Sequence, residues 1–370
     1  MEALFEVLPD SELLANLEAT RHTGRPGYPI RTVWRSLVAS FYLGLVHDTD
    51  LVRALESNPL LAAAIGIDSP EKVRSKFAIC RFRRKLAGFR DAVADVLTAS
   101  VDRLRDTLPG FGETVAVDAT DIKAWANSFH QDTDPDAGVG AKGKGMQKTY
   151  FWYGYKVHLA VDADSELPIW FDVTPANRYD GHLLAPVLSD IKARFDWFSP
   201  SFVTADKGYD AGYNFDYVGR DLGAVPVIDV RANSRPRKRE GRECEAEPVI
   251  TPHGLRYRCR RLPYDPVCPR FGTCPLLPVF VDSPLSDAGA PYYERHSTFP
   301  YGSREWKTVY NKRVSVERVF SRLKGYRKLN AVRTRRLPKV WLHVALSLLA
   351  MSASALVGAR RSSGVRQCVA

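Results

Sequence analysis

Tyr310 to Gly325 contains the sequence YNKRVSVERVFSRLKG, in which apolar residues recur at helical spacing. At about 100° per residue, one apolar stripe covers roughly a third of the circumference and comprises Val309, Val316, Val319, Phe320 and Leu323. We therefore predict one continuous helix here, with this stripe packed against the core. Arg318, Arg322, Gly325 and Tyr326 then lie on the solvent side.

A polar edge borders the stripe on this predicted helix. Arg313, Glu317 and Lys324 lie within about 60° of Tyr310 on the 3.6-residue period. An ordinary ion pair between Arg313 and Glu317, four residues apart on a surface helix, is one explanation. The alternative is functional, because a carboxylate flanked by two cations and a phenol suits a metal ion held beside a phosphate.

The spacing Tyr-x2-Arg-x3-Glu-x6-Lys resembles the motif of a large group of bacterial insertion-sequence transposases, and every position of the motif is matched. These are DDE enzymes with a ribonuclease H-like core. The resemblance implies that Glu317 is the third catalytic carboxylate. It also implies that Tyr310, Arg313 and Lys324 contact DNA phosphates near the cleaved end.

Positive charge is concentrated around this motif. The chain carries a net charge of +11, and the segment from Arg304 to Lys339 holds thirteen Lys and Arg residues against two Glu. Such a field indicates a polyanionic partner. We therefore expect double-stranded DNA as the partner, both element ends and target, and add Arg318 and Lys328 of this segment to the DNA-binding set. The DNA complex is expected to contain a homodimer.

The two ends of the chain favour a cytoplasmic, nucleoid-associated protein without a membrane partner. The N-terminus, MEALFEVLPDSELL, lacks the basic and apolar regions of a secretory signal. Trp341 to Val357 is apolar, but it falls short of the roughly 20 residues that span a bilayer. We predict a buried core helix there.

Residues 1–108 are predicted to form a helical DNA-binding domain. Ile30 to Leu45 follows the start signal Pro29, Asp48 is a candidate cap, and the sequence from Ser69 to Glu71 resembles a helix start. The basic residues that follow are Lys72, Arg74, Lys76, Arg81, Arg83, Arg84 and Lys85. They indicate either a DNA-backbone contact or merely a solvated face. The stretches GRPGYPIRTVWRSLVASFYLG and SKFAICRFRRKL also resemble the N-terminal domain of the same transposases.

From Thr114 the periodicity changes to that of strands. Three β-rich runs, a helix, a strand, a second helix and a fifth strand follow in order. This is the ribonuclease H-like order, an α/β fold with a mixed sheet flanked by helices. We assign residues 109–357 to this catalytic domain, with an insertion at about 231–304, and expect a disordered tail at 358–370.

Two segments interrupt the catalytic domain. Ser128 to Lys148 contains GVGAKGKG, but Gly145 stands where a P-loop requires Ser or Thr, so we predict a flexible basic loop. The insertion carries four cysteines, Cys244, Cys259, Cys268 and Cys274. Their spacing leaves open a zinc site, free thiols or a disulfide, and a reducing cytosol favours free thiols.

Two further carboxylates follow predicted strands. Asp118 comes after Val-Ala-Val, and Asp206 comes after Val-Thr-Ala. Taken singly, each is a common turn or cap residue. Together with Glu317 they reproduce the order Asp, Asp, Glu of the DDE enzymes. Three carboxylates are suitable ligands for two Mg²⁺ or Mn²⁺ ions, whereas Asp121 would point to the opposite face of its strand.

The sequence therefore predicts a transposase that binds terminal inverted repeats and catalyses metal-dependent strand cleavage and strand transfer. A DNA-binding regulator derived from such an enzyme, without cleavage activity, is the alternative. A nuclease of the same fold is a third possibility. Among the aromatic residues expected near the site, Trp125 and Tyr209 are interpreted as packing residues, and Asp180 is interpreted as a helix cap.

Overall fold

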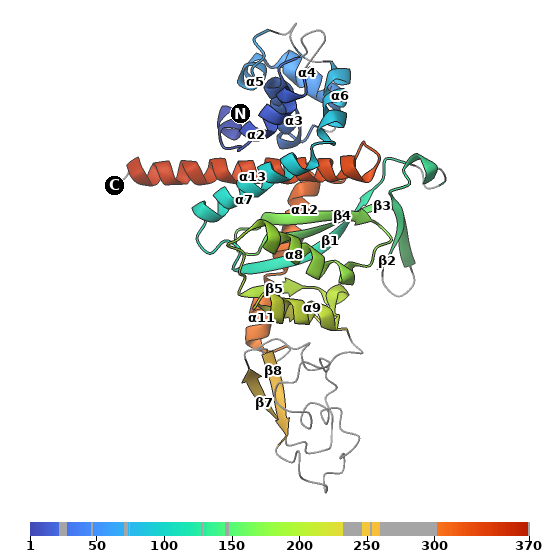
Figure 1. Ribbon diagram of the computed structural model, residues 1–370, viewed down its shortest axis with the longest axis vertical. Coiled ribbons are helices and arrows are strands. Elements are labelled where there is room, and N and C mark those ends of the chain that lie inside the picture. The colour runs from blue at the N-terminus through green and yellow to red at the C-terminus, as the bar shows by residue number, and fades with distance from the viewer. Residues whose placement is uncertain are drawn as a thin grey trace.

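A computed structural model of the chain describes residues 1–21, 28–45, 47–69, 73, 75–126, 129, 131–144, 148–231, 246–251, 254–259 and 302–368. Figure 1 shows three regions along the long axis. Helices from the N-terminal part lie at one end, the sheet lies in the middle, and a long helix from the C-terminus crosses between them.

The described residues of the N-terminal part form seven helices. They are α1 (Glu2–Glu6), α2 (Ser11–Ala19), α3 (Ile30–Tyr42), α4 (Asp48–Ser57), α5 (Pro59–Ile65), α6 (Lys76–Leu86) and α7 (Arg90–Thr107). Pro29 caps α3 as the sequence predicted, but α4 is capped by His47, and Asp48 is its first residue.

The basic helix α6 begins later than predicted. Ser75 is its N-cap, and the Ser75 hydroxyl accepts a hydrogen bond from the Ala78 amide at 3.3 Å. The predicted start at Ser69 is therefore wrong, because the cap that satisfies the first amides lies six positions further on. Lys72 and Arg74 lie outside the described residues, whereas Arg81, Arg83, Arg84 and Lys85 are on α6.

The sheet has the predicted ribonuclease H-like topology. Its strands are β1 (Thr114–Lys123), β2 (Gly138–Lys144), β3 (Lys148–Asp162), β4 (Leu167–Pro175), β5 (Phe202–Ala205) and β6 (Val225–Ile228). β3 pairs antiparallel with β1 and β4, whereas β1, β5 and β6 are parallel to one another. The connecting helices are α8 (Leu184–Arg194) and α9 (Gly212–Asp216), the latter continued by a π-helical turn over Tyr217–Asp221. The predicted α/β fold is confirmed.

The predicted loop between β1 and β3 contains an additional strand. β2 pairs antiparallel with the first half of β3, from Gly138 opposite Gly154 to Lys144 opposite Lys148. The glycines that suggested a loop serve this pairing, because a Cβ on Gly140 would lie 2.4 Å from the Trp152 ring. The flat ring fits only over a residue without a side chain. The result is a hairpin whose first strand, β2, is at an edge of the sheet next to β3 (Figure 1).

The motif helix is divided in two. α11 (Arg304–Asn311) and α12 (Val314–Tyr326) replace the single predicted helix. At the break the hydrogen bonds tighten to i→i+3, with the Arg313 amide bonded to the Tyr310 carbonyl at 2.9 Å and the Val316 amide to the Arg313 carbonyl at 3.2 Å. The apolar stripe is otherwise as predicted: Val316, Val319, Phe320 and Leu323 are buried, and α12 packs on β1 and β3.

The last helix, α13 (Leu337–Cys368), packs against α3 and α7 on one side and β4 on the other. Its segment 337–360 is long and apolar enough to cross a membrane, but 78% of its apolar window is buried inside the protein. The predicted core helix is therefore confirmed. The helix continues through Cys368, where the sequence predicted a disordered tail from residue 358.

The insertion contains one described hairpin, β7 (Ala246–Thr251) and β8 (Gly254–Cys259). Cys244, Cys268 and Cys274 lie outside the described residues, and Cys259 is described only in its backbone. The cysteine site therefore stays a prediction, as does the division of the chain into two domains.

Candidate active site

Strand register places two of the predicted carboxylates next to each other. β1 and β5 pair in parallel up to Val117 opposite Ala205, so Asp118 and Asp206 are the next residues on neighbouring strands. β5 pairs with β6 up to Ala205 opposite Ile228, which puts Asp229 beside Asp206. Three carboxylates therefore stand in one row. Asp229 was missed in the sequence, although it follows an apolar run just as Asp206 does.

Backbone amides hold the first two carboxylates. The Ala119 amide donates to Asp118 Oδ1 at 2.7 Å, and the Gly208 amide donates to Asp206 Oδ1 at 2.7 Å. Asp206 caps the 3₁₀ turn Lys207–Tyr209, so the β5 terminus fixes its side chain. Strand pairing sets the positions of the two residues, and these local hydrogen bonds orient their carboxylates.

Burial and proximity alter the acidity of this pair. Burial, followed by the neighbouring Asp206 charge, raises the pKa of Asp118 to about 7. Burial also raises the pKa of Asp206, against the effects of the Gly208 amide and Arg313. Two half-buried carboxylates that disfavour each other's charge are stabilised by a cation between or beside them.

A guanidinium supplies positive charge at this position. Arg313 Nη1 lies 3.7 Å from Asp118 Oδ2, and Arg313 Nη2 lies 2.7 Å from Glu317 Oε1. Arg313 is thus located between the strand carboxylate and the helix carboxylate. Glu317 is half exposed, with 51% of its side chain accessible, whereas Arg313 is only 17% exposed. The ion pair explanation of the Arg313 and Glu317 spacing is confirmed, and the pair lies at the carboxylate row, whereas the functional explanation stays a prediction.

Tyr310 reaches the same place from α11. Its ring stacks on Trp306 at 4.5 Å, and the Arg313 guanidinium lies 5.7 Å from its centroid. Burial raises the pKa of Tyr310, and Asp229 and Asp206 raise it further. The phenol therefore remains protonated near the carboxylate row and can donate a hydrogen bond.

Lys324 lies further along α12. Burial lowers its pKa, whereas the nearby charge of Asp121 opposes that shift. Asp121 is therefore an electrostatic neighbour of Lys324.

The structure does not bring every assigned residue to the carboxylates. Arg318 Nη1 binds Glu166 Oε1 at 3.0 Å, and Arg322 binds the same carboxylate at 2.8 Å. Both arginines therefore form ion pairs with Glu166, in the turn between β3 and β4. Lys328 lies beyond the end of α12, in the connection to α13.

Three side chains expected near the site differ in their surroundings. Asp180 makes no cap hydrogen bond and instead pairs with Lys156 at 2.8 Å, so its interpretation as a cap is wrong. Tyr209 is fully buried, as predicted, whereas Trp125 is 47% exposed.

The donor set fits a divalent metal in part. Asp118 and Asp206 offer hard oxygen ligands side by side, as Mg²⁺ and Mn²⁺ prefer. In the described part of the chain, however, no group of three His, Cys, Asp or Glu side chains is close enough to hold one ion. Glu317 faces Arg313 instead. The two aspartates therefore fit the metal as they stand, whereas Glu317 fits it only after leaving Arg313.

Comparisons with known families agree with this geometry. A family model described as a transposase DDE domain matches residues 109–352, and one described as a transposase domain matches residues 1–85. A search of curated proteins finds no match. The first match covers the sheet, the carboxylate row, helices α11 and α12, and the first half of α13. The chain therefore belongs to the family of transposases with a DDE domain.

Proposed function

We propose that this transposase binds the terminal inverted repeats of its mobile element and cuts and joins DNA strands there with Mg²⁺ or Mn²⁺. The observation that carries the proposal is the adjacency of Asp118 and Asp206 on parallel strands, joined to Glu317 through Arg313. A regulator that only binds DNA has no need of two adjacent half-buried carboxylates whose pKa values are raised by burial.

The residues of the site have two roles, metal binding and phosphate binding. Asp118 and Asp206 would hold the metal, and Glu317 would join them once Arg313 turns to a DNA phosphate. Bound divalent ions supply charge neutralisation at the attacked phosphodiester. Arg313 is suited to the phosphate, because its planar group can donate two parallel hydrogen bonds. Tyr310, kept protonated by burial, donates to a neighbouring phosphate oxygen.

Lys324 and the wider basic surface would position the duplex. Since Lys324 is half-buried on α12, its ammonium can reach one phosphate without a large loss of side-chain freedom. The homodimer in the DNA complex and the cytoplasmic location stay predictions. The molecular mass of the complex with a terminal duplex, measured by light scattering, tests the first.

The experiment for the proposed function uses the full chain and a labelled duplex from the boundary of the gene. Inverted repeats bracketing the gene define that duplex. Wild-type protein should cleave it at the repeat end with Mg²⁺ or Mn²⁺, whereas Glu317→Gln should bind it and leave it intact. Wild-type protein that binds the duplex tightly, yet cleaves it no faster than the Glu317→Gln variant, would leave the regulator as the function.

A further inference from the structure

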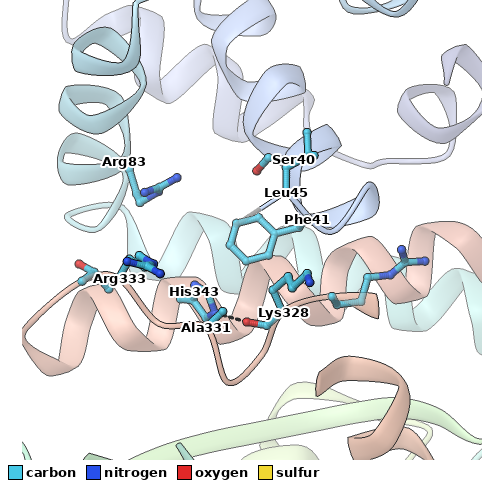
Figure 2. A pocket seen from close by; sticks show the side chains of 10 residues that line it. Ser40, Phe41, Leu45, Arg83, Lys328, Ala331, Arg333 and His343 are labelled. Atoms are coloured by element: carbon cyan, nitrogen blue, oxygen red, sulfur yellow. Dashed lines mark hydrogen bonds between the residues drawn. The ribbon is translucent and has the colours of Figure 1, made fainter. Parts of the chain in front are cut away.

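A small pocket lies where the N-terminal helices meet the connection between α12 and α13. Figure 2 shows Arg83 of α6 on one side and Lys328 and Arg333 of the connection on the other, around Phe41 and His343. These residues come from widely separated parts of the sequence. The pocket therefore exists only when the N-terminal helices and the C-terminal segment are packed together.

Four cationic side chains line the pocket, and of these only Arg83 has a carboxylate partner among the described residues, Asp48. The described residues that line it include Arg83, Arg327, Lys328 and Arg333, and none of them is Asp or Glu. The His343 ring adds no charge, because burial lowers its pKa to about 4. Like charges that converge without an anion repel one another, so an anionic ligand stabilises this arrangement.

The four cations differ in how far they are already engaged. Arg83 pairs with Asp48 at 2.5 Å, and Arg327 binds the Tyr42 carbonyl and the Ser354 hydroxyl. Arg333 lies over the Trp125 ring at 4.4 Å. Within the described residues, neither Lys328 nor Arg333 forms an ion pair. These two side chains are thus the ones available to a ligand.

The backbone of Lys328 is held in an unusual conformation. Its φ is 56°, in the left-handed region that a lysine rarely occupies. Its carbonyl accepts hydrogen bonds from the Ala331 amide at 2.8 Å and from His343 Nε2 at 3.1 Å. Its Cε lies 3.5 Å from the position of a Cβ on Gly44, at the corner after α3. The side chain is therefore directed across the junction toward the N-terminal helices.

The pocket is connected to the strand that carries Asp118. Arg333 stacks on Trp125 and Arg335 Nε donates to the Trp125 carbonyl at 2.9 Å, just beyond the end of β1. Arg333 and Arg335 thus lie at the end of the strand that also carries Asp121, the charged neighbour of Lys324. A polymer with regularly spaced negative charges matches these cations better than a single small anion.

We propose that this pocket binds one phosphate of the DNA backbone through Lys328 and Arg333 and thereby fixes the N-terminal helices to the catalytic part on DNA. The inference rests on the proposed function, because it requires that the chain binds duplex DNA. It adds a specific contact at the junction, away from the carboxylates.

The test measures binding of the full chain to the terminal duplex by fluorescence anisotropy at several salt concentrations. Lys328→Gln and Arg333→Gln should each weaken binding about tenfold, the effect of one lost charge-assisted contact. Each should also reduce the salt slope, which is the steepness with which the logarithm of the binding constant falls with the logarithm of the salt concentration, by roughly 0.9. Lys192→Gln, which removes an equal charge from α8, should leave both quantities unchanged. Thermal melting without DNA should show that all variants are folded.

Two probes identify the source of the phosphate. A series of duplexes, each with one neutral methylphosphonate, should contain a position that weakens wild-type binding but does not weaken Lys328→Gln binding further. Inorganic phosphate at matched ionic strength should raise the melting temperature of wild type and Lys328→Gln equally. A rise confined to wild type, with equal duplex binding, would assign the pocket to a free anion and overturn the inference.

The remaining outcomes separate the two proposals. If wild-type protein binds the duplex and both variants bind it equally with the same salt slope, the pocket has no DNA contact and the proposed function is unaffected. If wild-type protein binds no duplex at all, the proposed function fails and this inference fails with it.

Discussion

The strand carboxylates and the helix carboxylate of the candidate site are held in different ways. Asp118 and Asp206 follow directly from strand register, and each accepts a hydrogen bond from a nearby backbone amide. Glu317 is half exposed, and its bond to Arg313, at 2.7 Å, spans one turn of backbone. One part of the site is thus fixed by the fold, and the other depends on a single ion pair.

This difference indicates how the site is completed. A sheet edge places its carboxylates before any ligand arrives, so the cost of bringing them together is met during folding. An exposed ion pair is worth little, about 1 kcal/mol or less, and is easily exchanged. We therefore expect Glu317 to exchange Arg313 for metal when DNA draws the guanidinium away.

The largest effect on cleavage is expected for the two strand carboxylates, Asp118 and Asp206. Asp118→Asn and Asp206→Asn should each lower cleavage of the terminal duplex about a thousandfold, because each removes a charged oxygen ligand worth several kcal/mol in the transition state. DNA binding should persist in an anisotropy assay. Asp216→Asn, on α9 and paired with Arg220, is the matched control. Equal cleavage by Asp118→Asn and the control would remove Asp118 from the site.

Substitution of Arg313, which pairs with Glu317 and lies near Asp118, should have the next largest effect on cleavage. Arg313→Ala should slow cleavage about ten- to a hundredfold, through loss of a charge-assisted phosphate contact. Since Arg313 also lowers the pKa of Asp118, its removal should move the rising limb of the pH–rate profile to higher pH. Arg313→Lys should restore the pH profile more fully than the rate, because lysine keeps the charge but loses the paired donors. An unshifted profile for Arg313→Ala would contradict the contact.

The pKa of Asp118 also predicts a stability effect in the absence of metal. The pKa of Asp118 in the folded protein, about 7, exceeds the ordinary value of 3.8. The protonated carboxyl therefore contributes fully to folding stability below pH 4, and this contribution is lost as the pH rises to 7. Relative to Asp118→Asn, wild-type protein should lose on the order of 1 to 3 kcal/mol of unfolding free energy between pH 5 and pH 8. Urea denaturation of both proteins measures this. Parallel stability curves would show that Asp118 is ionised throughout.

The smallest effect is expected at Lys324. Lys324→Ala should weaken duplex binding a few-fold and lower the salt slope by roughly 0.9, one phosphate contact. Cleavage at saturating DNA should change little, because Lys324 is not in the carboxylate row. A thousandfold loss of cleavage at saturating DNA would instead place this lysine at the reacting phosphate.

The sequence predicted most of the fold because the relevant signals are local. The apolar runs indicated β1, β3, β4, β5 and β6 in their chain order, although the glycine-rich β2 was missed, and the stripe from Val316 to Leu323 indicated the buried face of α12. The break at Lys312 and Arg313 was missed, since both residues keep right-handed helical backbone angles and only the hydrogen bonds change from i→i+4 to i→i+3. The start of α6 was misplaced because Ser69 and Ser75 are equally good caps in sequence.

The site was only partly predictable, because the sequence shows local signals and some contacts of the site join residues far apart in the chain. Asp118 and Asp206 each follow an apolar run, so their shared edge could be inferred. The place of Asp229 depends on β6 lying next to β5, which is a matter of sheet order. Likewise, the pairing of Arg318 with Glu166 joins residues far apart in the chain, and no local pattern indicates it.

Binding of Mn²⁺ to the full chain with terminal duplex, followed by electron paramagnetic resonance, tests the central claim most directly. The claim is that Asp118 and Asp206 form a ready metal site that Glu317 completes. Wild-type protein should bind about two ions per chain, Asp118→Asn and Asp206→Asn should bind weakly or not at all, and Glu317→Gln should keep one. Asp216→Asn should match wild type. Mn²⁺ binding that is the same in wild type, Asp118→Asn and Asp206→Asn would contradict the account.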